Sequence, residues 1–265
     1  MGGRISSLVF QPPSKRSHIN STKYIILPTS KGNRIPAFYF DRSAHITVLV
    51  SHGNAEDLGM IYDQFFDFSR QLNVNVMAYE YSGYGRATGS PSESNCYADI
   101  DAAFKYLVEI KKVVPSRLVL LGRSIGSGPS CYLAERLALS GTPVGGVMLQ
   151  SPVLSILRVV LPDLRWTWWG DMFPNVDRVK RMECPIFVIH GTRDEIVPFR
   201  HGQDLFLATP VQWRARPLWV EGGGHNDLEG RLRQEGTYFS CVLEFLREWC
   251  SGEGGGHRGL HGSVY

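Results

Sequence analysis

The sequence has few cysteines, and none of them are paired at a spacing typical of metal ligands. Its 265 residues include five cysteines, an odd number, with no Cys-x-x-Cys motif. This pattern argues against a disulfide framework and a zinc site, and it favours a reducing compartment. Most of the five are interpreted as core or helix-face residues: Cys96, Cys131, Cys184, Cys241 and Cys250.

The sequence also lacks a long apolar run and a large excess of charge of either sign. No run reaches the length of a transmembrane helix and no signal-peptide pattern opens the chain, so we expect a cytoplasmic protein. The net charge of +3 is too small and too widely spread to indicate a nucleic-acid partner. With 43% hydrophobic and 20% charged residues and no internal repeats, the chain is predicted to form one globular enzyme domain.

What the chain does have is a buried-strand pattern that runs into Gly-x-Ser-x-Gly. The apolar residues 118–121 are followed by Gly122, Ser124 and Gly126, and small residues open a helix behind them. This arrangement is typical of a nucleophile elbow, in which a strained turn lifts a serine hydroxyl clear of the sheet edge. The competing interpretation is that Ser124 is an ordinary small residue in a strand-to-helix turn.

Two further apolar runs precede an acid and a histidine. Residues 185–191 are followed by Asp194, and residues 218–221 are followed by His225. The order Ser, Asp, His, each beyond a strand, is that of the α/β-hydrolases. His225 would take the proton of Ser124, and Asp194 would orient the imidazole and stabilise the imidazolium. Glu195 is an alternative acid, but Asp194 follows its strand sooner; His190 is interpreted as structural.

An oxyanion hole is expected beside the serine. Residues 47–51 are predicted to form a strand, and residues 52–55 to form the loop after it. In this fold that loop gives one backbone N–H and the residue after the nucleophile gives the other, which predicts the N–H groups of Asn54 and Ile125. His52 is interpreted as a structural residue that orients the loop.

The order of the predicted elements indicates an α/β fold. Two antiparallel strands come first, and strands then alternate with helical stretches, which predicts a mainly parallel twisted sheet flanked by helices, with a short cap. Residues 1–20 are predicted to form a flexible arm, residues 21–250 the α/β-hydrolase domain, and residues 251–265 a disordered glycine-rich tail. The expected elements are strands over 23–27, 34–40, 47–51, 74–80, 118–121, 146–150, 185–191 and 218–221, and helices over 62–71, 97–110, 127–139 and 238–249.

The cap is predicted between Ser151 and the strand that precedes Asp194. We expect about half of its large apolar residues to be ordinary helix packing, while the three tryptophans could also wall an acyl-chain groove near Ser124. Because the cap is short, the serine would be reachable by a bulky, protein-attached substrate. The apolar residues are Leu157, Val159, Val160, Leu161, Trp166, Trp168, Trp169 and Phe173.

The first six residues match an N-myristoylation pattern. Gly2 would be exposed after removal of Met1, and Ser6 is in place. One myristoyl chain binds membranes only marginally, and nearby Arg4, Lys15 and Arg16 would add attraction to anionic lipid. We therefore expect peripheral contact with the cytosolic face of membranes. The alternative is a solvated basic tail.

Several motifs together resemble the cytosolic α/β-hydrolase domain-containing protein 17 family over about residues 24–249. Members of that family are membrane-associated serine hydrolases that remove palmitoyl groups from protein cysteines, and the resemblance implies Ser124 as nucleophile, Asp194 as acid and His225 as base. Animal members carry a cysteine-rich, palmitoylated N-terminus, whereas no cysteine precedes Cys96 here, so a myristoylated Gly2 would replace that anchor. The motifs are 80–85 (EYSGYG), 91–93 (PSE), 97–103 (YADIDAA), 122–126 (GRSIG), 173–175 (FPN), 190–192 (HGT), 218–222 (LWVEG) and 224–227 (GHND).

The resulting functional hypothesis is a palmitoyl-protein thioesterase that acts on S-acylated proteins through an acyl-serine intermediate. This chemistry calls for no metal and no organic cofactor. One alternative is an esterase or lipase acting on lipids or small esters, or a serine peptidase of the prolyl-oligopeptidase type. The short cap and the absence of a propeller domain count against the peptidase. A second alternative is a non-enzymatic interaction module on a retained hydrolase fold, against which the full set of catalytic parts argues.

Overall fold

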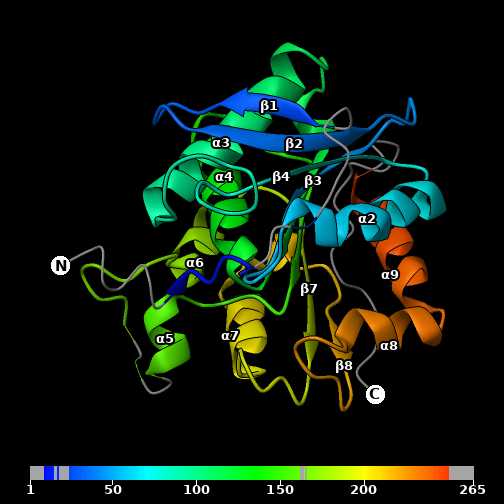
Figure 1. Ribbon diagram of the computed structural model, residues 1–265. Coiled ribbons are helices and arrows are strands. Elements are labelled where there is room, and N and C mark those ends of the chain that lie inside the picture. The colour runs from blue at the N-terminus through cyan, green and yellow to red at the C-terminus, as the bar shows by residue number, and fades with distance from the viewer. Residues whose placement is uncertain (1–8, 15–16, 18–23, 162–163, 165, 251–265) are drawn as a thin grey trace.

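The protein is described here by a computed structural model that covers residues 9–14, 17, 24–161, 164 and 166–250. The chain forms one eight-stranded sheet with the order β1-β2-β4-β3-β5-β6-β7-β8 (Figure 1). β1 and β2 pair antiparallel, β2 joins β4 antiparallel, and every later pairing is parallel. The strands are β1 (Ile25–Pro28), β2 (Arg34–Phe40), β3 (Thr47–Ser51), β4 (Asn75–Tyr79), β5 (Leu118–Arg123), β6 (Gly146–Gln150), β7 (Ile186–Gly191) and β8 (Leu218–Val220).

Helices cover both faces of this sheet, as the sequence predicted. On one face lie α2 (Leu58–Leu72), α8 (Leu228–Gln234) and α9 (Thr237–Phe245), and on the other lie α3 (Glu93–Glu109), α4 (Ser127–Leu139), α6 (Asn175–Arg178) and α7 (Arg200–Ala208) (Figure 1). The fold is the predicted α/β-hydrolase fold. Short 3-10 turns occur at Pro115–Arg117, Ser124–Gly126, Val179–Arg181 and Val211–Trp213, and a π-helical turn at Leu246–Cys250 continues α9.

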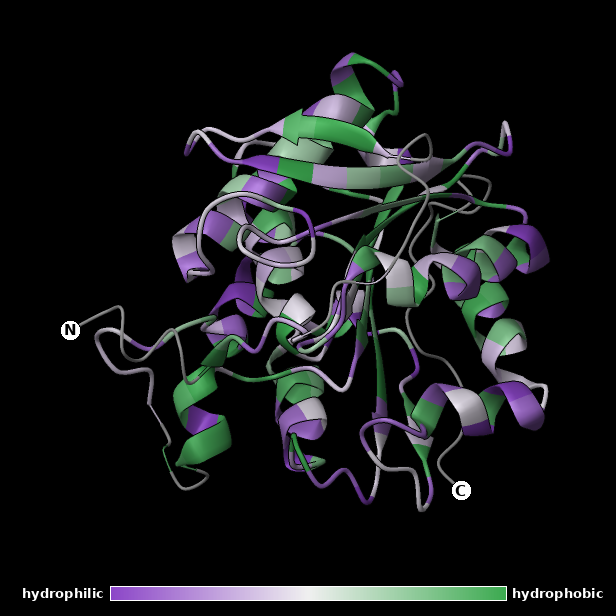
Figure 2. Cartoon of the chain, viewed as in Figure 1, coloured by the Kyte–Doolittle hydropathy of each residue, from purple (hydrophilic) through white to green (hydrophobic). Residues whose placement is uncertain are grey.

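The central strands are apolar because both of their faces are buried. In β3, Val48 and Val50 pack with α2 and α9, while Leu49 between them packs with the layer that contains α3 and α4. The alternation follows from the two-residue period of a strand, and a parallel sheet with helices on both sides needs apolar side chains in both directions. Figure 2 shows these central strands as hydrophobic, whereas the helices alternate between hydrophobic and hydrophilic residues.

Two helices begin earlier than the apolar spacing predicted. α2 begins at Leu58 because the Asp57 side chain accepts hydrogen bonds from the N–H groups of Gly59 and Met60. α3 begins at Glu93 because the Ser92 hydroxyl accepts from the Asn95 N–H. Asp57 and Ser92 are thus N-terminal caps, whose side chains satisfy free N–H groups in the first turn of each helix. Because both residues are polar, a prediction based on the spacing of apolar residues could not locate these helix starts.

The part of the predicted flexible arm that the structure describes is docked on the domain. Phe10 is buried, and its ring contacts that of Phe173 edge to face, with 6.1 Å between the ring centroids. The Ser17 N–H donates to the Asp57 carboxylate at 2.7 Å. Phe10 therefore adds apolar area to the core at this part of the predicted arm. The rest of the arm, with Gly2, and the predicted tail at 251–265 lie outside the described residues.

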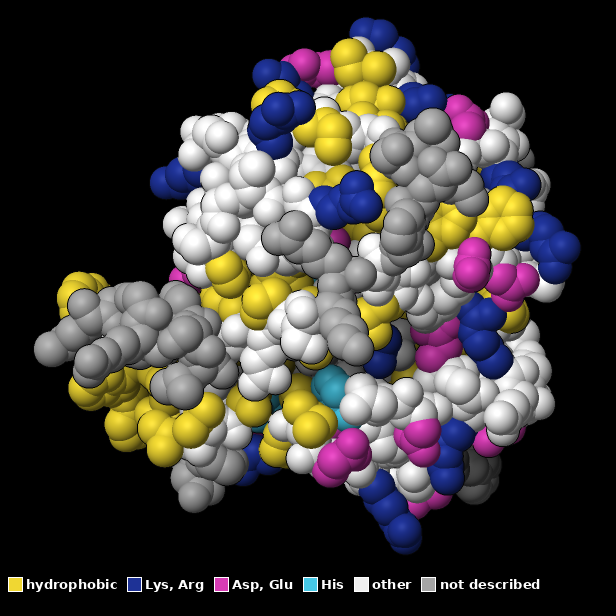
Figure 3. All heavy atoms as spheres, viewed as in Figure 1, with side chains coloured by type: hydrophobic (Ala, Val, Ile, Leu, Met, Phe, Trp, Pro, Cys, Tyr) yellow, Lys and Arg dark blue, Asp and Glu magenta, His cyan; other side chains and the backbone are white. Residues whose placement is uncertain are grey.

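The cap is short and carries an apolar surface. It contains α5 (Ile156–Val160), and after it Trp166, Trp168 and Trp169 are 63%, 61% and 98% exposed. The expectation of helix packing therefore fits Phe173, which is fully buried, but not the tryptophans. Figure 3 shows hydrophobic side chains gathered over this part of the molecule. No helix in the described part of the chain is both long and apolar enough to span a bilayer.

Candidate active site

Ser124 lies on a sharp turn between β5 and α4. Its φ of 52° is in the left-handed region, which non-glycine residues seldom adopt. The turn fits because the flanking glycines have no side chain: a Cβ on Gly122 would lie 2.6 Å from the Gly126 carbonyl oxygen, and one on Gly126 would lie 2.1 Å from the Ser51 carbonyl oxygen. The predicted strand–turn–helix geometry is therefore present around Ser124.

The fold brings Ser124, His225 and Asp194 into one hydrogen-bonded chain. The His225 Nε2 atom lies 3.1 Å from the Ser124 Oγ atom, and the His225 Nδ1 atom lies 2.8 Å from the Asp194 Oδ2 atom. The three residues follow β5, β8 and β7, whose carboxyl ends meet at one edge of the sheet. Because a carboxylate can only accept, the Nδ1 atom carries the hydrogen and the Nε2 lone pair faces the hydroxyl. In this tautomer His225 can take the proton of Ser124.

Asp194 is held as a carboxylate by several donors. Its Oδ1 atom accepts from the N–H groups of Ile196 at 3.0 Å and Val197 at 2.7 Å, besides the contact with His225. Burial alone would raise the pKa of Asp194, but the hydrogen bonds from His190 and His225 outweigh it and lower the pKa well below the usual range. The alternative acid, Glu195, does not contact the imidazole ring: its carboxylate accepts from the His225 backbone N–H at 3.2 Å.

The loop after β3 lies directly against the serine turn. The close approach of Gly126 to the Ser51 and His52 carbonyl oxygens brings the two segments together. Among the described residues, the Asn54 N–H makes no hydrogen bond to a backbone acceptor. The structure thus places the loop of Asn54 beside the turn of Ile125, and the role of their N–H groups as an oxyanion hole stays a prediction.

A buried ion pair supports this loop. The His52 Nε2 atom lies 2.9 Å from the Glu80 carboxylate, and the His52 Nδ1 atom lies 2.9 Å from the Gly53 carbonyl oxygen. Burial lowers the pKa of His52, but the hydrogen bond and negative charge of Glu80 outweigh it, so that the pKa is raised overall. The interpretation of His52 as a loop-orienting residue agrees with these contacts, but its partner Glu80 was missed.

The described N-terminal segment is attached to the same loop through the Asn54 side chain. The Asn54 amide donates to the Val9 carbonyl oxygen at 2.7 Å, and its oxygen accepts from the Gln11 N–H at 2.9 Å. The Tyr84 hydroxyl donates to that oxygen at 2.7 Å. Sequence reasoning used only the backbone of Asn54 and missed this contact. The EYSGYG motif that contains Tyr84 was the one available signal.

Comparisons with known proteins agree with this geometry. A family model described as serine aminopeptidase, S33, matches residues 42–176. The chain is 43% identical over 224 residues to alpha/beta hydrolase domain-containing protein 17B of Xenopus laevis, covering 83% of this chain and 73% of that protein, and it is equally similar to the Homo sapiens protein of that name. It is 40% identical over 227 residues to alpha/beta hydrolase domain-containing protein 17C of Mus musculus, covering 85% and 66% of the two chains.

The chain belongs to the alpha/beta hydrolase domain-containing protein 17 family. The resemblance drawn from its motifs is confirmed, and so is a hydrolase function at the level of that family. Solved structures share the fold at low identity. An esterase from Pyrococcus furiosus has a TM-score of 0.72 at 18% identity and covers 91% of this chain and all of its own, and an alpha-beta hydrolase from Vibrio vulnificus has a TM-score of 0.67 at 20% identity, covering 86% and 88%.

The cysteines of this member of the protein 17 family are poor candidates for a nucleophile. All five thiols are free, and four of them are buried, with Cys241 partly so. Burial raises the pKa of every one, to about 12 for Cys131 and Cys250. A thiol must be ionised to attack, so these groups are unsuited to covalent catalysis. Among the described residues, no group of three or more His, Cys, Asp and Glu side chains is placed to hold a metal ion.

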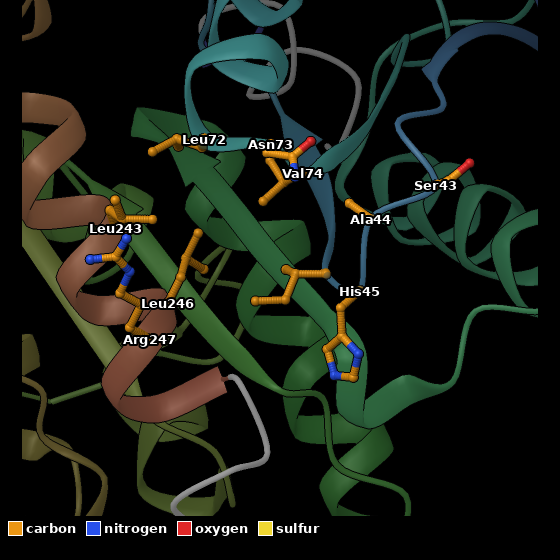
Figure 4. Close-up of a pocket in the computed structure, with 10 residues that line it drawn as sticks. Ser43, Ala44, His45, Leu72, Asn73, Val74, Leu243, Leu246 and Arg247 are labelled. Carbon is orange, nitrogen blue, oxygen red and sulfur yellow. The ribbon is translucent and has the colours of Figure 1, made fainter.

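A pocket of about 310 Å³ lies at the opposite edge of the sheet from Ser124. It is formed by the segments that lead into β3 and β4, which include His45 and Val74. Leu243 of α9 and Leu246 of the π-helical turn after it complete the wall (Figure 4). Its walls are mostly apolar, and it shares no residue with the Ser124 site. This pocket therefore adds nothing to the chemistry of the protein 17 family site.

Proposed function

We propose that this member of the protein 17 family is a serine hydrolase that removes S-acyl groups from protein cysteines. The observation that supports serine chemistry is the hydrogen-bonded chain Ser124–His225–Asp194, with Ser124 on a strained turn. The preference for palmitoyl thioesters rests on the family resemblance, because the names of the relatives state only a hydrolase.

The proposed reaction has two halves. His225 takes the Ser124 proton as the hydroxyl attacks the thioester carbonyl, and the N–H groups of Asn54 and Ile125 stabilise the negative oxygen of the tetrahedral intermediate. The C–S bond breaks, and the imidazolium returns the proton to the departing cysteine thiolate. A water activated by His225 then attacks the acyl-serine, releases the fatty acid and restores Ser124.

Peripheral membrane contact is part of the proposal. Trp166, Trp168 and Trp169 with Val160 and Leu161 form an exposed apolar cap surface, each more than half exposed. Tryptophan is favoured at the membrane–water interface, and an apolar surface of this kind marks an interaction site. We further propose that a myristoyl group on Gly2 provides the second anchor, on the cytosolic face of the membrane.

The test is fluorophosphonate labelling of the purified protein, with hydrolysis of a palmitoylated-cysteine peptide followed in parallel. Ser124→Ala should neither label nor cleave. Ser130→Ala is the matched control, because the buried Ser130 hydroxyl has no hydrogen-bond partner among the described residues and its loss should leave both signals unchanged. A wild type that fails to label beside an active control hydrolase would overturn the serine mechanism and favour a binding role.

A second candidate activity is aminopeptidase cleavage, which the description of the matched family model favours. Acyl thioesters, acyl esters and aminoacyl amides should be offered to one preparation. Labelling with turnover of the esters or amides alone would keep Ser124 as nucleophile and replace the proposed substrate class.

A further inference from the structure

The carboxylate of Asp194 lies between two histidines. Besides His225, the His190 Nε2 atom approaches the Asp194 Oδ2 atom at 3.3 Å, and both side chains in this second contact are fully buried. His190 is the second-last residue of strand β7, four residues before Asp194. The sequence interpretation treated it as a structural residue.

The protonation of His190 follows from its neighbours. The His190 Nε2 atom also lies 2.9 Å from the Val197 carbonyl oxygen, which can only accept a hydrogen bond. The Nε2 atom must therefore carry a hydrogen. The Nδ1 atom is buried and has no hydrogen-bond partner among the described residues, so a hydrogen there would be an unsatisfied donor. The neutral Nε2–H tautomer satisfies both observations.

The ring has no room to turn away from Asp194. A Cβ on Gly202 would lie 2.5 Å from the His190 Nδ1 atom, so α7 closes directly on that side of the imidazole. The Phe199 ring stands edge to face with it, 5.8 Å between centroids. The one N–H of the ring therefore stays on the side of the Val197 carbonyl oxygen, which lies 2.9 Å from Nε2, with the Asp194 Oδ2 atom 3.3 Å from the same nitrogen.

We infer that His190 is a positioning residue of the active site, which donates its Nε2–H to Asp194 and so fixes the carboxylate that orients His225. This inference rests on the proposed serine mechanism and deepens it. A carboxylate that accepts from one more donor binds the His225 proton less strongly, so His190 also sets how readily His225 is available as a base. The hydrogen bond from His190 is among the contacts that lower the pKa of Asp194.

The other titratable groups around this cluster are few and identifiable. The Glu195 carboxylate accepts from the His225 backbone N–H at 3.2 Å. His201 on α7 uses its ring to accept from the Leu154 N–H and to contact the Arg158 carbonyl oxygen, and burial lowers the pKa of His201 to about 4. His201 is therefore neutral over the pH range in which a serine hydrolase is assayed. A shift of the pH profile in a His190 variant would not come from titration of His201.

The first test uses the wild-type protein labelled with ¹⁵N-histidine. Two-bond ¹H–¹⁵N correlation spectra distinguish the tautomers of each imidazole, with His190→Gln used to assign the His190 signals. We expect the hydrogen of the neutral His190 ring to lie on Nε2, as its contact with the Val197 carbonyl oxygen requires. A neutral ring with its hydrogen on Nδ1 would overturn the inference whatever substrate the protein prefers.

The second test compares two replacements of similar length, His190→Gln and His190→Met. The glutamine amide keeps a donor near the position of Nε2, whereas methionine has none. With p-nitrophenyl butyrate as substrate, the acid limb of the kcat/KM profile should move about half a pH unit upward in His190→Met, which is about 3-fold in rate on that limb. His190→Gln should keep the wild-type acid limb.

The outcomes separate a positioning role from a packing role. If His190 only fills space, either variant lowers the active fraction equally at every pH, and the limb does not move. An unmoved limb in His190→Met with normal fluorophosphonate labelling of the wild type would reject the role of His190 alone. Absence of labelling in the wild type would instead reject the serine mechanism on which it rests.

Discussion

Two buried histidine–carboxylate pairs serve the region around Ser124, and they use opposite ring nitrogens: His225 contacts its carboxylate through Nδ1 and His52 through Nε2. The pair of His225 and Asp194 has a 2.8 Å contact, and the pair of His52 and Glu80 has a 2.9 Å contact. The second nitrogen of His225 faces the Ser124 hydroxyl, whereas the second nitrogen of His52 faces the Gly53 carbonyl oxygen. A hydroxyl can give up a proton and a carbonyl cannot, so only the first pair can do base chemistry.

The comparison shows that pairing with a carboxylate does not by itself make a histidine catalytic. His52 is closed in by Tyr81, whose hydroxyl donates to the His52 carbonyl oxygen at 2.7 Å, and the Glu80 carboxylate also accepts from the Leu58 N–H at 3.1 Å. All of these bonds hold the loop that carries Asn54. One pair therefore serves the chemistry and the other serves the shape of the loop beside it.

The largest effect should come from breaking the first pair. His225→Gln removes the base, and we expect kcat/KM for an ester or thioester substrate to fall about 10⁴-fold while the protein stays folded. The measurement is steady-state hydrolysis, with circular dichroism to verify folding. Activity within 10-fold of wild type would show that His225 is not the base.

Breaking the second pair should cost stability rather than chemistry. Glu80→Gln leaves the buried His52 without its charged partner, and we expect the free energy of unfolding to fall by about 3 kcal/mol. Urea denaturation measures this loss, and activity per folded molecule should fall far less than in His225→Gln. A folded Glu80→Gln protein as inactive as His225→Gln would mean that the second pair takes part in the chemistry.

The second pair should also give a pH dependence of stability. The pKa of folded His52 is raised above its unfolded value of 6.5, so the folded state binds an additional proton between these two values. The stabilisation from His52 is fully present below pH 6.5 and is lost as the pH rises through the raised folded pKa, with a slope of at most about 1.4 kcal/mol per pH unit. The double variant His52→Gln/Glu80→Gln should lose this slope in denaturation measured from pH 6 to 9. A slope that persists in the double variant would assign it to another group.

A smaller effect is expected where the N-terminal segment meets the loop of the second pair. Asn54→Ala keeps the backbone N–H but removes the contacts to Val9 and Gln11. We expect about 10-fold lower activity, since a misplaced oxyanion donor stabilises the transition state less well, and faster hydrogen exchange at Gln11. Tyr84→Phe is a milder variant of the same contact, because it removes the hydroxyl that accepts from the Gln11 N–H at 3.0 Å but keeps the Asn54 amide. Unchanged exchange at Gln11 would contradict the attachment.

The smallest effect on folding and chemistry should come from the exposed cap, which contacts neither pair. Trp169 is 98% exposed. Trp169→Ser should change the free energy of unfolding by less than about 0.5 kcal/mol and leave hydrolysis of a soluble ester unchanged. Its binding to anionic vesicles in a co-sedimentation assay should decrease. Equal vesicle binding by wild type and variant would remove this surface from the membrane proposal.

The sequence was sufficient for the fold and for the three residues of the hydrogen-bonded chain, because both follow from local patterns. Apolar runs mark the strands, and a parallel sheet brings the residues after them to one edge, so Ser124, Asp194 and His225 had to lie close together. The contacts of Glu80 and Asn54 could not be obtained in this way. They join residues 28 and 43 positions apart through the paths of loops, and no periodicity specifies a loop path. The contact between His190 and Asp194 is local, but it depends on a ring orientation that α7 imposes.

The contacts within the hydrogen-bonded chain of Ser124, His225 and Asp194 also form at different stages of folding. Ser124 and His225 are 101 positions apart, and His225 is carried by β8, a strand of three residues at the edge of the sheet. Contacts of such long range form late, and short edge strands are among the first parts of a native protein to open. The serine is therefore without its base until β8 has docked. A nascent chain that ends before Leu218 should be inert, and the labelling of Ser124 should report the fraction of molecules in which β8 is docked.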